Sequence, residues 1–299
     1  MNDKEQLIAQ LAAVVPARPP GLIQLLKRAP NSLRWKFIIW YWLLKREATG
    51  MTHRLQNRRV LHFLHIGKTG GTAAKSALRG HENSGDYEIS LHEHEFQLKD
   101  VPLGEKVVFF VRDPISRFVS GFYGRQRQDL PRHDAPWTPG EEIAFRRFKT
   151  PNELALALSA DDQELQAAAV DAIRIISHLR SPHWTWFKNE RYFLSRRSDI
   201  LFIGFQETLK EDFALLKKIL NLPQNVRLPE DEIGSHKNPA HMDRRLDEQA
   251  IRNLKIWYAR DYQFLELCRK LVAQLRSDLD KSAIDHKAPK SAKAPVAMP

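Results

Sequence analysis

One short stretch of the chain combines glycine, threonine and lysine in a way that suits an anion-binding loop. It reads His65-Ile66-Gly67-Lys68-Thr69-Gly70-Gly71-Thr72. Gly70 and Gly71 let the backbone approach a phosphate or sulfate group closely, and Lys68 adds a full positive charge. Thr69 and Thr72 add hydroxyl donors. The alternative, a glycine-rich turn without a ligand, is disfavoured by this concentration of donors.

The order of residues in the stretch argues against a nucleotide kinase or hydrolase with a P-loop, which is the main alternative enzyme. The phosphate loop of those proteins has the order G-x-x-x-x-G-K-[ST], with the lysine after the last glycine. Here the Lys68-Thr69 pair comes before Gly70 and Gly71. The dinucleotide pattern G-x-G-x-x-G also fails.

A second polar motif follows the most strand-like run of the chain, KVVFFV at Lys106–Val111. Arg112 comes directly after this run, and Asp113 and Pro114 begin a predicted helix. Ligands of open α/β sheets bind at the carboxyl ends of the strands, where Arg112 would lie. Ser120 follows about two helical turns on. An arginine and a serine hydroxyl suit a terminal phosphate, although a structural Arg112–Asp113 pair with a surface serine fits the same residues.

A pair of histidines stands between the two motifs, in Leu91-His92-Glu93-His94-Glu95. A neutral imidazole titrates near working pH, so either histidine could serve as a general base. The same residues could bind a metal ion, or lie on the surface without a role. Glu93 and Glu95 are further candidates for a base.

Short apolar runs alternate with helical patterns along the chain. Strands are predicted at 60–66, 87–91, 106–111 and 200–205, and helices at 72–80, after Pro114 and at 208–220. Residues 128–198 have a mostly helical pattern, and 244–277 indicate one or two long amphipathic helices. This alternation predicts an α/β fold with a mostly parallel central sheet flanked by helices.

The ends of the chain differ from its centre. We expect a helical N-terminal extension at 1–58, a catalytic domain at 59–278 and a disordered tail at 279–299, which is rich in Lys, Ala and Pro. The most apolar segment, at 35–44, is too short to span a bilayer, which takes roughly 20 apolar residues. Its basic flanks and tryptophans leave peripheral membrane contact open. The lack of an export signal in the sequence given favours a cytoplasmic enzyme.

The composition sets further limits. The 299 residues, 42% of them hydrophobic, suit one large α/β domain or two small ones. A net charge of +11 favours polyanionic partners such as phosphate-bearing cofactors or acidic glycans. Nucleic-acid motifs are absent, so we expect no nucleic-acid partner. The single cysteine, Cys268, forms no disulfide framework and has no metal-ligand spacing around it.

Taken together, H-x-x-K-T-G-G-T after one strand and R-D-P-x-x-R-x-x-S-x-x-Y after another resemble the sulfotransferases that use PAPS (3′-phosphoadenosine-5′-phosphosulfate). The resemblance is to the carbohydrate branch, which includes heparan sulfate 2-O- and galactose 3-O-sulfotransferases. It implies a P-loop-like sulfotransferase fold. It covers about 60–271 in outline, and its specific motifs lie within 60–123. The late strand and helix from Phe202 onward also resemble the family.

The resemblance implies roles for individual residues. Those expected to hold the 5′-phosphosulfate are Lys68, Thr69, Gly70, Gly71 and Thr72. Arg112 and Ser120 would hold the 3′-phosphate, and Lys237 sits where the family often has a loop over the nucleotide. The 2-O-sulfotransferases carry their catalytic histidine in an H-x-H element between the two motifs, so we expect His94 to be the base and His92 to line the site. Lys68 would cover the charge that develops on the bridging oxygen, so no metal is expected.

Overall fold

The computed structural model describes residues 2–131, apart from 14–58, together with 134–230 and 242–285. Four parallel strands form one sheet in the order β2-β1-β3-β4. Their bounds are β1 Val60–Leu64, β2 Glu88–Leu91, β3 Lys106–Val111 and β4 Ile200–Phe205. The sheet confirms the predicted α/β class and its four predicted strands.

The register brings the ends of three strands to one edge of the sheet. Leu64, the last residue of β1, pairs with Phe109 of β3, and Val111 at the end of β3 pairs with Phe205 of β4. The loops that leave β1, β3 and β4 therefore start side by side. Parallel neighbours also require crossover connections, which the helices supply.

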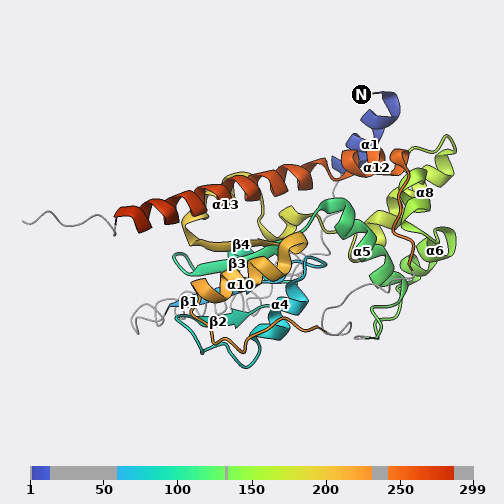
Figure 1. Ribbon diagram of the computed structural model, residues 1–299. Coiled ribbons are helices and arrows are strands. Elements are labelled where there is room, and N and C mark those ends of the chain that lie inside the picture. The colour runs from blue at the N-terminus through green and yellow to red at the C-terminus, as the bar shows by residue number, and fades with distance from the viewer. Residues whose placement is uncertain (1, 14–58, 132–133, 231–241, 286–299) are drawn as a thin grey trace, which may run out of the picture.

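Helices cover both faces of the sheet (Figure 1). Because side chains alternate along a strand, Leu61 and Phe63 of β1 pack with α4 (Gly71–Leu78) and α10 (Leu209–Ile219) on one face. Leu64 of β1 packs on the other face with Phe264 of α13 (Ala259–Asp285). Cys268 is buried in the same layer, where burial raises the pKa of its thiol.

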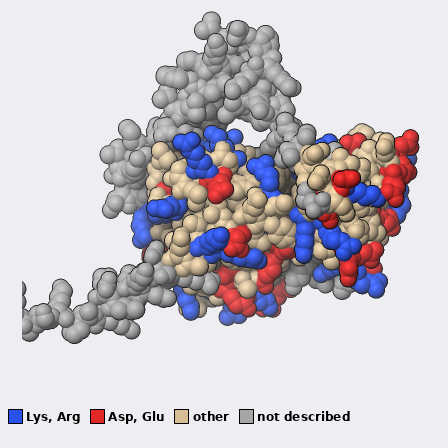
Figure 2. Space-filling model, turned by 90° about the horizontal axis from the view of Figure 1, so that it is seen from above, with Lys and Arg blue, Asp and Glu red and all other residues tan. Residues whose placement is uncertain are grey.

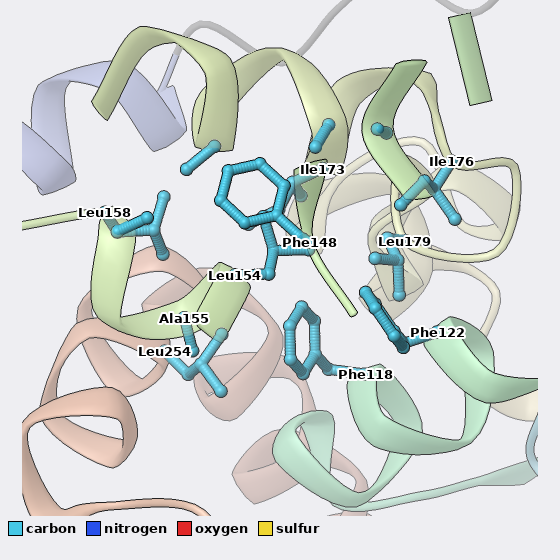
Figure 3. Packing of buried hydrophobic residues seen from close by; sticks show 14 of the residues in the cluster. Phe118, Phe122, Phe148, Leu154, Ala155, Leu158, Ile173, Ile176, Leu179 and Leu254 are labelled. Atoms are coloured by element: carbon cyan, nitrogen blue, oxygen red, sulfur yellow. The ribbon is translucent and has the colours of Figure 1, made fainter. Parts of the chain in front are cut away.

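A helical lobe stands beside the sheet. Its helices are α1 (Asp3–Ala13), α5 (Pro114–Gln126), α6 (Pro139–Arg147), α7 (Pro151–Ala157), α8 (Gln163–Ile175) and α12 (Glu248–Trp257). Phe118 and Phe122 of α5 point into this core toward Leu154 and Leu179 (Figure 3). α5 thus belongs to the lobe, while its first residue follows the end of β3 closely. It joins the lobe to the edge of the sheet where the strands end.

Short elements complete the described chain. They are η1 (Leu98–Asp100), η2 (His183–Trp186), α9 (Glu190–Ser195), η3 (Arg197–Asp199) and η4 (Gln206–Thr208). The helix α13 runs to Asp285 and so covers 279–285 of the predicted tail. The segment 35–44, Lys237 and 286–299 lie outside the described residues.

Charges on the described surface are mixed. Both basic and acidic residues lie on the face seen in Figure 2, with uncharged surface between them. Among the residues the structure describes, no helix has the length and apolar character needed to cross a membrane.

Candidate functional site

The glycine-bearing loop leaves β1 and ends in the first turn of α4. Lys68 and Gly70 both have positive φ, at 65° and 85°, and Gly70 is the N-cap residue without a side-chain cap. The first N–H groups of a helix have no intrahelical partner and carry a partial positive charge. A Cβ atom at Gly71 would lie 2.7 Å from Cδ2 of His65, so this position has room only for glycine. The loop therefore has the geometry of an anion cradle.

The two threonines of the loop occupy different positions. The Thr69 side chain is buried, and its Oγ1 donates to the backbone oxygen of Ile66 at 2.9 Å. This hydroxyl closes the loop on itself, which leaves the backbone of Thr69 as its means of contacting a ligand. Thr72 lies in the first turn of α4, with its Oγ1 3.3 Å from Nε2 of His65.

Lys68 reaches from the loop to α5. Its Nζ donates to Oδ1 of Asp129 at 3.2 Å. Gly124 of α5 makes room for it, since a Cβ atom there would lie 2.4 Å from Nζ. Burial lowers the pKa of Lys68, and the carboxylate of Asp129 opposes that shift. The ammonium is thus held in a nearly closed environment beside the loop.

Asp129 collects three donors. Besides Lys68, it accepts from Nη1 of Arg125 at 2.9 Å, and its Oδ1 lies 3.1 Å from Nε2 of His178. Burial would raise the pKa of Asp129, but the hydrogen bonds from His178 and Arg125 and the charge of Lys68 hold it well below its usual range. Arg125 also forms a bidentate pair with Glu141, at 2.9 and 2.7 Å. The same pairing lowers the pKa of Glu141 to about 2, against its burial.

Arg117 joins the loop to the segment after α8. Its Nε donates to the backbone oxygen of Gly67 at 2.9 Å, and its Nη2 donates to that of Ser181 at 2.8 Å. The side chain is buried, and burial lowers its pKa. The guanidinium of Arg117 therefore holds the loop and the segment that contains His178 at a fixed distance from each other.

Arg112 lies at the end of β3, as predicted, and faces the loop. Its Nη1 donates to the backbone oxygen of Lys68 at 3.3 Å. Its buried Nε has no hydrogen-bond partner among the described residues. Burial lowers the pKa of Arg112 to about 10, partly offset by Glu207 and Asp113. A buried donor without a partner fits an arginine that binds an anionic ligand.

Ser120 stands on α5 one turn from Arg117 and one turn from Gly124. These three residues share one face of the helix. On that face Arg117 hydrogen-bonds to Gly67, and Gly124 lies against the side chain of Lys68. Arg112 thus lies at the end of β3 and Ser120 on the side of α5 that faces the loop, and their pairing on one phosphate stays a prediction.

His94 lies against the loop. Its Nδ1 donates to the backbone oxygen of His65 at 3.0 Å, because a carbonyl oxygen can only accept. The neutral ring then carries its lone pair on Nε2, the atom that a base would use. Burial lowers the pKa of His94, which keeps the ring neutral at physiological pH. A Cβ atom built on Gly67 would lie 3.8 Å from Cε1 of this ring.

His92 has different neighbours. Its Nε2 lies 2.8 Å from Nδ1 of His62, whose Nε2 lies 2.5 Å from Oε2 of Glu105. The ring also stacks on Phe96, with 3.5 Å between the ring centres. Burial and the neighbouring His62 and Lys75 lower the pKa of His92 to about 3. The structure therefore brings His94 to Gly67 and places His92 in a separate chain of polar side chains.

Lys75 of α4 forms hydrogen bonds to the turn at 92–95, which contains both histidines. Its Nζ donates to the backbone oxygen of His92 and to Oε1 of Glu93, both at 2.7 Å. The hydrogen bond from Lys75 lowers the pKa of Glu93, whose carboxylate is thereby engaged. Glu95 is exposed. Glu93 also approaches the stretch, with its Oε2 3.9 Å from Nδ1 of His65, but of the candidate bases His94 is the one whose ring lies beside Gly67.

The sequence patterns gave no indication of several residues at this site. Asp129, His178 and Arg125 come from positions without a motif, and Lys75 follows the first motif within α4. Arg117 is the second arginine of the second motif, for which the sequence indicated no separate role. Within the described ranges, no cluster of three or more His, Cys, Asp or Glu side chains gathers as a metal site would require.

A family comparison assigns the class of protein that this fold and loop define. The sequence profile of the sulfotransferase family matches residues 52–267. The match covers most of the chain, so the chain belongs to the sulfotransferase family. It is accordingly a transferase acting on sulfuryl groups, in agreement with the four-stranded parallel sheet. A comparison with curated proteins gives no match.

Proposed function

We propose that the protein transfers a sulfuryl group from PAPS to a carbohydrate hydroxyl, with His94 as the general base. One observation carries the proposal. The ring of His94 stands beside Gly67 of the donor loop, in the tautomer whose lone pair is on Nε2. A base must lie within reach of the hydroxyl attacking the donor.

The nucleotide fits the residues of the site. The open first turn of α4 and the ammonium of Lys68 would hold the 5′-phosphosulfate. The Nε of Arg112, which has no hydrogen-bond partner in the described part of the chain, and the hydroxyl of Ser120 would hold the 3′-phosphate. The residues proposed for the 5′-phosphosulfate and those proposed for the 3′-phosphate lie next to each other, because Arg112 donates a hydrogen bond to the backbone oxygen of Lys68. The donor would thus be fixed at its two anionic ends.

In the proposed reaction, the acceptor oxygen attacks sulfur in line with the bridging oxygen of the donor. The new S–O bond forms as the bond to the 5′-phosphate breaks, and the hydroxyl proton passes to Nε2 of His94. Lys68 stabilises the negative charge on the departing phosphate, and 3′,5′-bisphosphoadenosine (PAP) leaves. As in phosphoryl transfer, positioning and charge stabilisation supply most of the rate.

The nucleotide kinase or hydrolase with a P-loop is not favoured, because the lysine of the loop precedes its glycines. The carbohydrate acceptor rests on the resemblance of the two motifs and the intervening H-x-H element to the carbohydrate branch. The basic net charge suits acidic saccharides in particular.

Two measurements test the proposal. Thermal shift with PAP and with ATP·Mg²⁺ separates the donor classes, and we expect PAP alone to stabilise the protein. Incubation with ³⁵S-labelled PAPS and a panel of desulfated heparin, chondroitin, galactosides and phenols then identifies the acceptor. Stabilisation by ATP·Mg²⁺ but not PAP would overturn the donor, and label on phenols alone would overturn the carbohydrate acceptor.

A further inference from the structure

A second histidine flanks Gly67, and the mechanism above does not use it. His178 follows α8 and lies against α5, where a Cβ atom at Gly121 would be 3.1 Å from Cβ of His178. Arg117 holds the backbone of nearby Ser181 and of Gly67 together. The side chain of His178 keeps 22% of its surface exposed, so the ring reaches solvent beside the loop.

The hydrogen bonds of His178 define its tautomer. Its Nε2 lies 3.1 Å from Oδ1 of Asp129, a carboxylate whose depressed pKa keeps it ionised and therefore only an acceptor. His178 must donate from Nε2, which leaves the lone pair of the neutral ring on Nδ1. Burial, reinforced by the charge of Lys68, lowers the pKa of His178 to about 4, so the ring is neutral at physiological pH.

The two histidines present their rings to the same point. The Cβ position at Gly67 lies 3.8 Å from Cε1 of His94 and 4.0 Å from Nδ1 of His178. No described residue donates a hydrogen bond to Nδ1 of His178. One hydroxyl has a single proton and cannot donate to both rings. The His94 atoms nearest that position are Cε1 and Nδ1, at 3.8 and 3.9 Å, so the lone pair on Nδ1 of His178 stands beside the ring of His94. That lone pair suits the proton of a hydroxyl other than the one that His94 would deprotonate.

We propose that Nδ1 of His178 binds a second hydroxyl of the acceptor, adjacent to the hydroxyl that His94 deprotonates. This inference rests on the proposed function and narrows its acceptor to molecules with neighbouring hydroxyls, such as the vicinal diol of a pyranose. Asp129 is then a positioning residue that orients His178 and Lys68 through one carboxylate. His178 takes no proton and accepts a hydrogen bond only.

Two substitutions separate the two nitrogens of the ring. In His178→Gln the amide reaches the Nε2 position and keeps the bond to Asp129, whereas in His178→Asn it lies near the Nδ1 position. The assay measures transfer of label from ³⁵S-PAPS to the saccharide panel and, in the same tubes, release of labelled sulfate to water. Water offers one oxygen where a diol offers two, so the ratio of the two rates reports on the contact between Nδ1 of His178 and a second acceptor oxygen.

We expect His178→Gln to lower the ratio of saccharide transfer to hydrolysis by about tenfold, the effect of one lost hydrogen bond. Hydrolysis and PAP affinity should stay within about twofold, since Asp129 and Lys68 keep their partners. His178→Asn should retain a higher ratio than His178→Gln. A wild-type ratio in His178→Gln would overturn the inference, as would parallel losses of both rates, because these indicate support of Lys68 alone.

Nitrogen NMR of the ¹⁵N-histidine-labelled protein tests the inference without activity. The His178 signals, identified by their loss in His178→Gln, should belong to the Nε2–H tautomer. A dominant Nδ1–H tautomer would overturn the inference. Labelled sulfate released to water with none on any saccharide would also overturn it. A wild-type protein that neither binds PAP nor cleaves PAPS would instead overturn the proposed function.

Discussion

Gly124→Ala is expected to disable the donor lysine while leaving the fold intact. The new Cβ atom would lie 2.4 Å from Nζ of Lys68 and 3.1 Å from its Cε, whereas ordinary contacts begin at 3.4 Å. The ammonium must therefore move by about 1 Å, and a misplacement of that size can cost about 10²-fold in rate. Oδ1 of Asp129, at 3.5 Å from the new atom, need not move.

Stability should change in the opposite direction. Gly124 lies within α5, where alanine is more favourable than glycine by about 1 kcal/mol. The displaced group is the end of a flexible side chain and yields at little cost. We therefore expect an unchanged or slightly raised melting temperature together with about 10²-fold slower transfer from ³⁵S-PAPS.

The double variant Lys68→Ala/Gly124→Ala is the control. Without the lysine side chain the new methyl group meets no ammonium, so it should add nothing to the loss caused by Lys68→Ala, which itself should be roughly 10² or more. The reasoning is refuted if Gly124→Ala retains turnover within about twofold of wild type, or if its effect is additive with that of Lys68→Ala.

Five further outcomes are expected. Arg112→Ala should weaken PAP binding by about 10- to 100-fold in calorimetry and adenosine 5′-phosphosulfate binding far less, because only PAP carries the 3′-phosphate; equal weakening removes this role. His94→Ala should lose transfer yet bind PAP, and His92→Ala should retain more activity; the opposite ranking swaps the two roles. Since burial lowers the pKa of His94, the wild-type rate should hold as pH falls to 6.5 and decline only below it, as the ring gains a proton; a decline centred above 6.5 contradicts this. Arg125→Ala should lower the free energy of unfolding, measured in urea at pH 7, by about 3–5 kcal/mol, because it removes the partner of buried carboxylates. The pKa of Glu141 is lower in the folded protein than in the unfolded chain, so Glu141 stabilises the fold above its unfolded-state pKa and loses this contribution as the pH falls toward about 2. The unfolding free energies of the variant and the wild type should therefore converge on acidification, as judged from the same urea titrations. Chelators should leave the wild-type rate unchanged, and loss restored by a divalent ion would indicate a metal.

Local patterns were sufficient for the elements that carry the donor loop. The apolar run 60–66, the glycines after it and the threonine that follows predict a strand, a loop and a helix, and the structure has β1, Gly67–Gly70 and α4 in that order. The run KVVFFV likewise predicts β3 with Arg112 at its end. Each of these features is encoded within about a dozen consecutive residues, because burial, φ and helix capping are local demands.

The partners of the site residues could not be obtained in this way. Lys68 meets Asp129 across 61 positions, and Arg117 meets Ser181 across 64. Nothing in the residues around Asp129 or His178 distinguishes them from surface positions in a helical region. Their contacts follow from how the helical lobe packs on α5 through Phe118 and Phe122.

The pair His92 and His94 shows what the sequence predicts and what only the tertiary structure determines. The sequence by itself determined that two imidazoles stand between the two motifs, and which residue types surround the anion cradle. Only the tertiary structure turned His94 toward Gly67 and His92 toward His62, because the direction of each ring depends on its hydrogen bond to His65 or His62, in or just after β1. The packing of α5 also brought His178 to the same loop. The backbone around His178 lies so close to Gly121 of α5 that a Cβ atom there would be 3.1 Å from Cβ of His178, and no local sequence pattern predicts this contact.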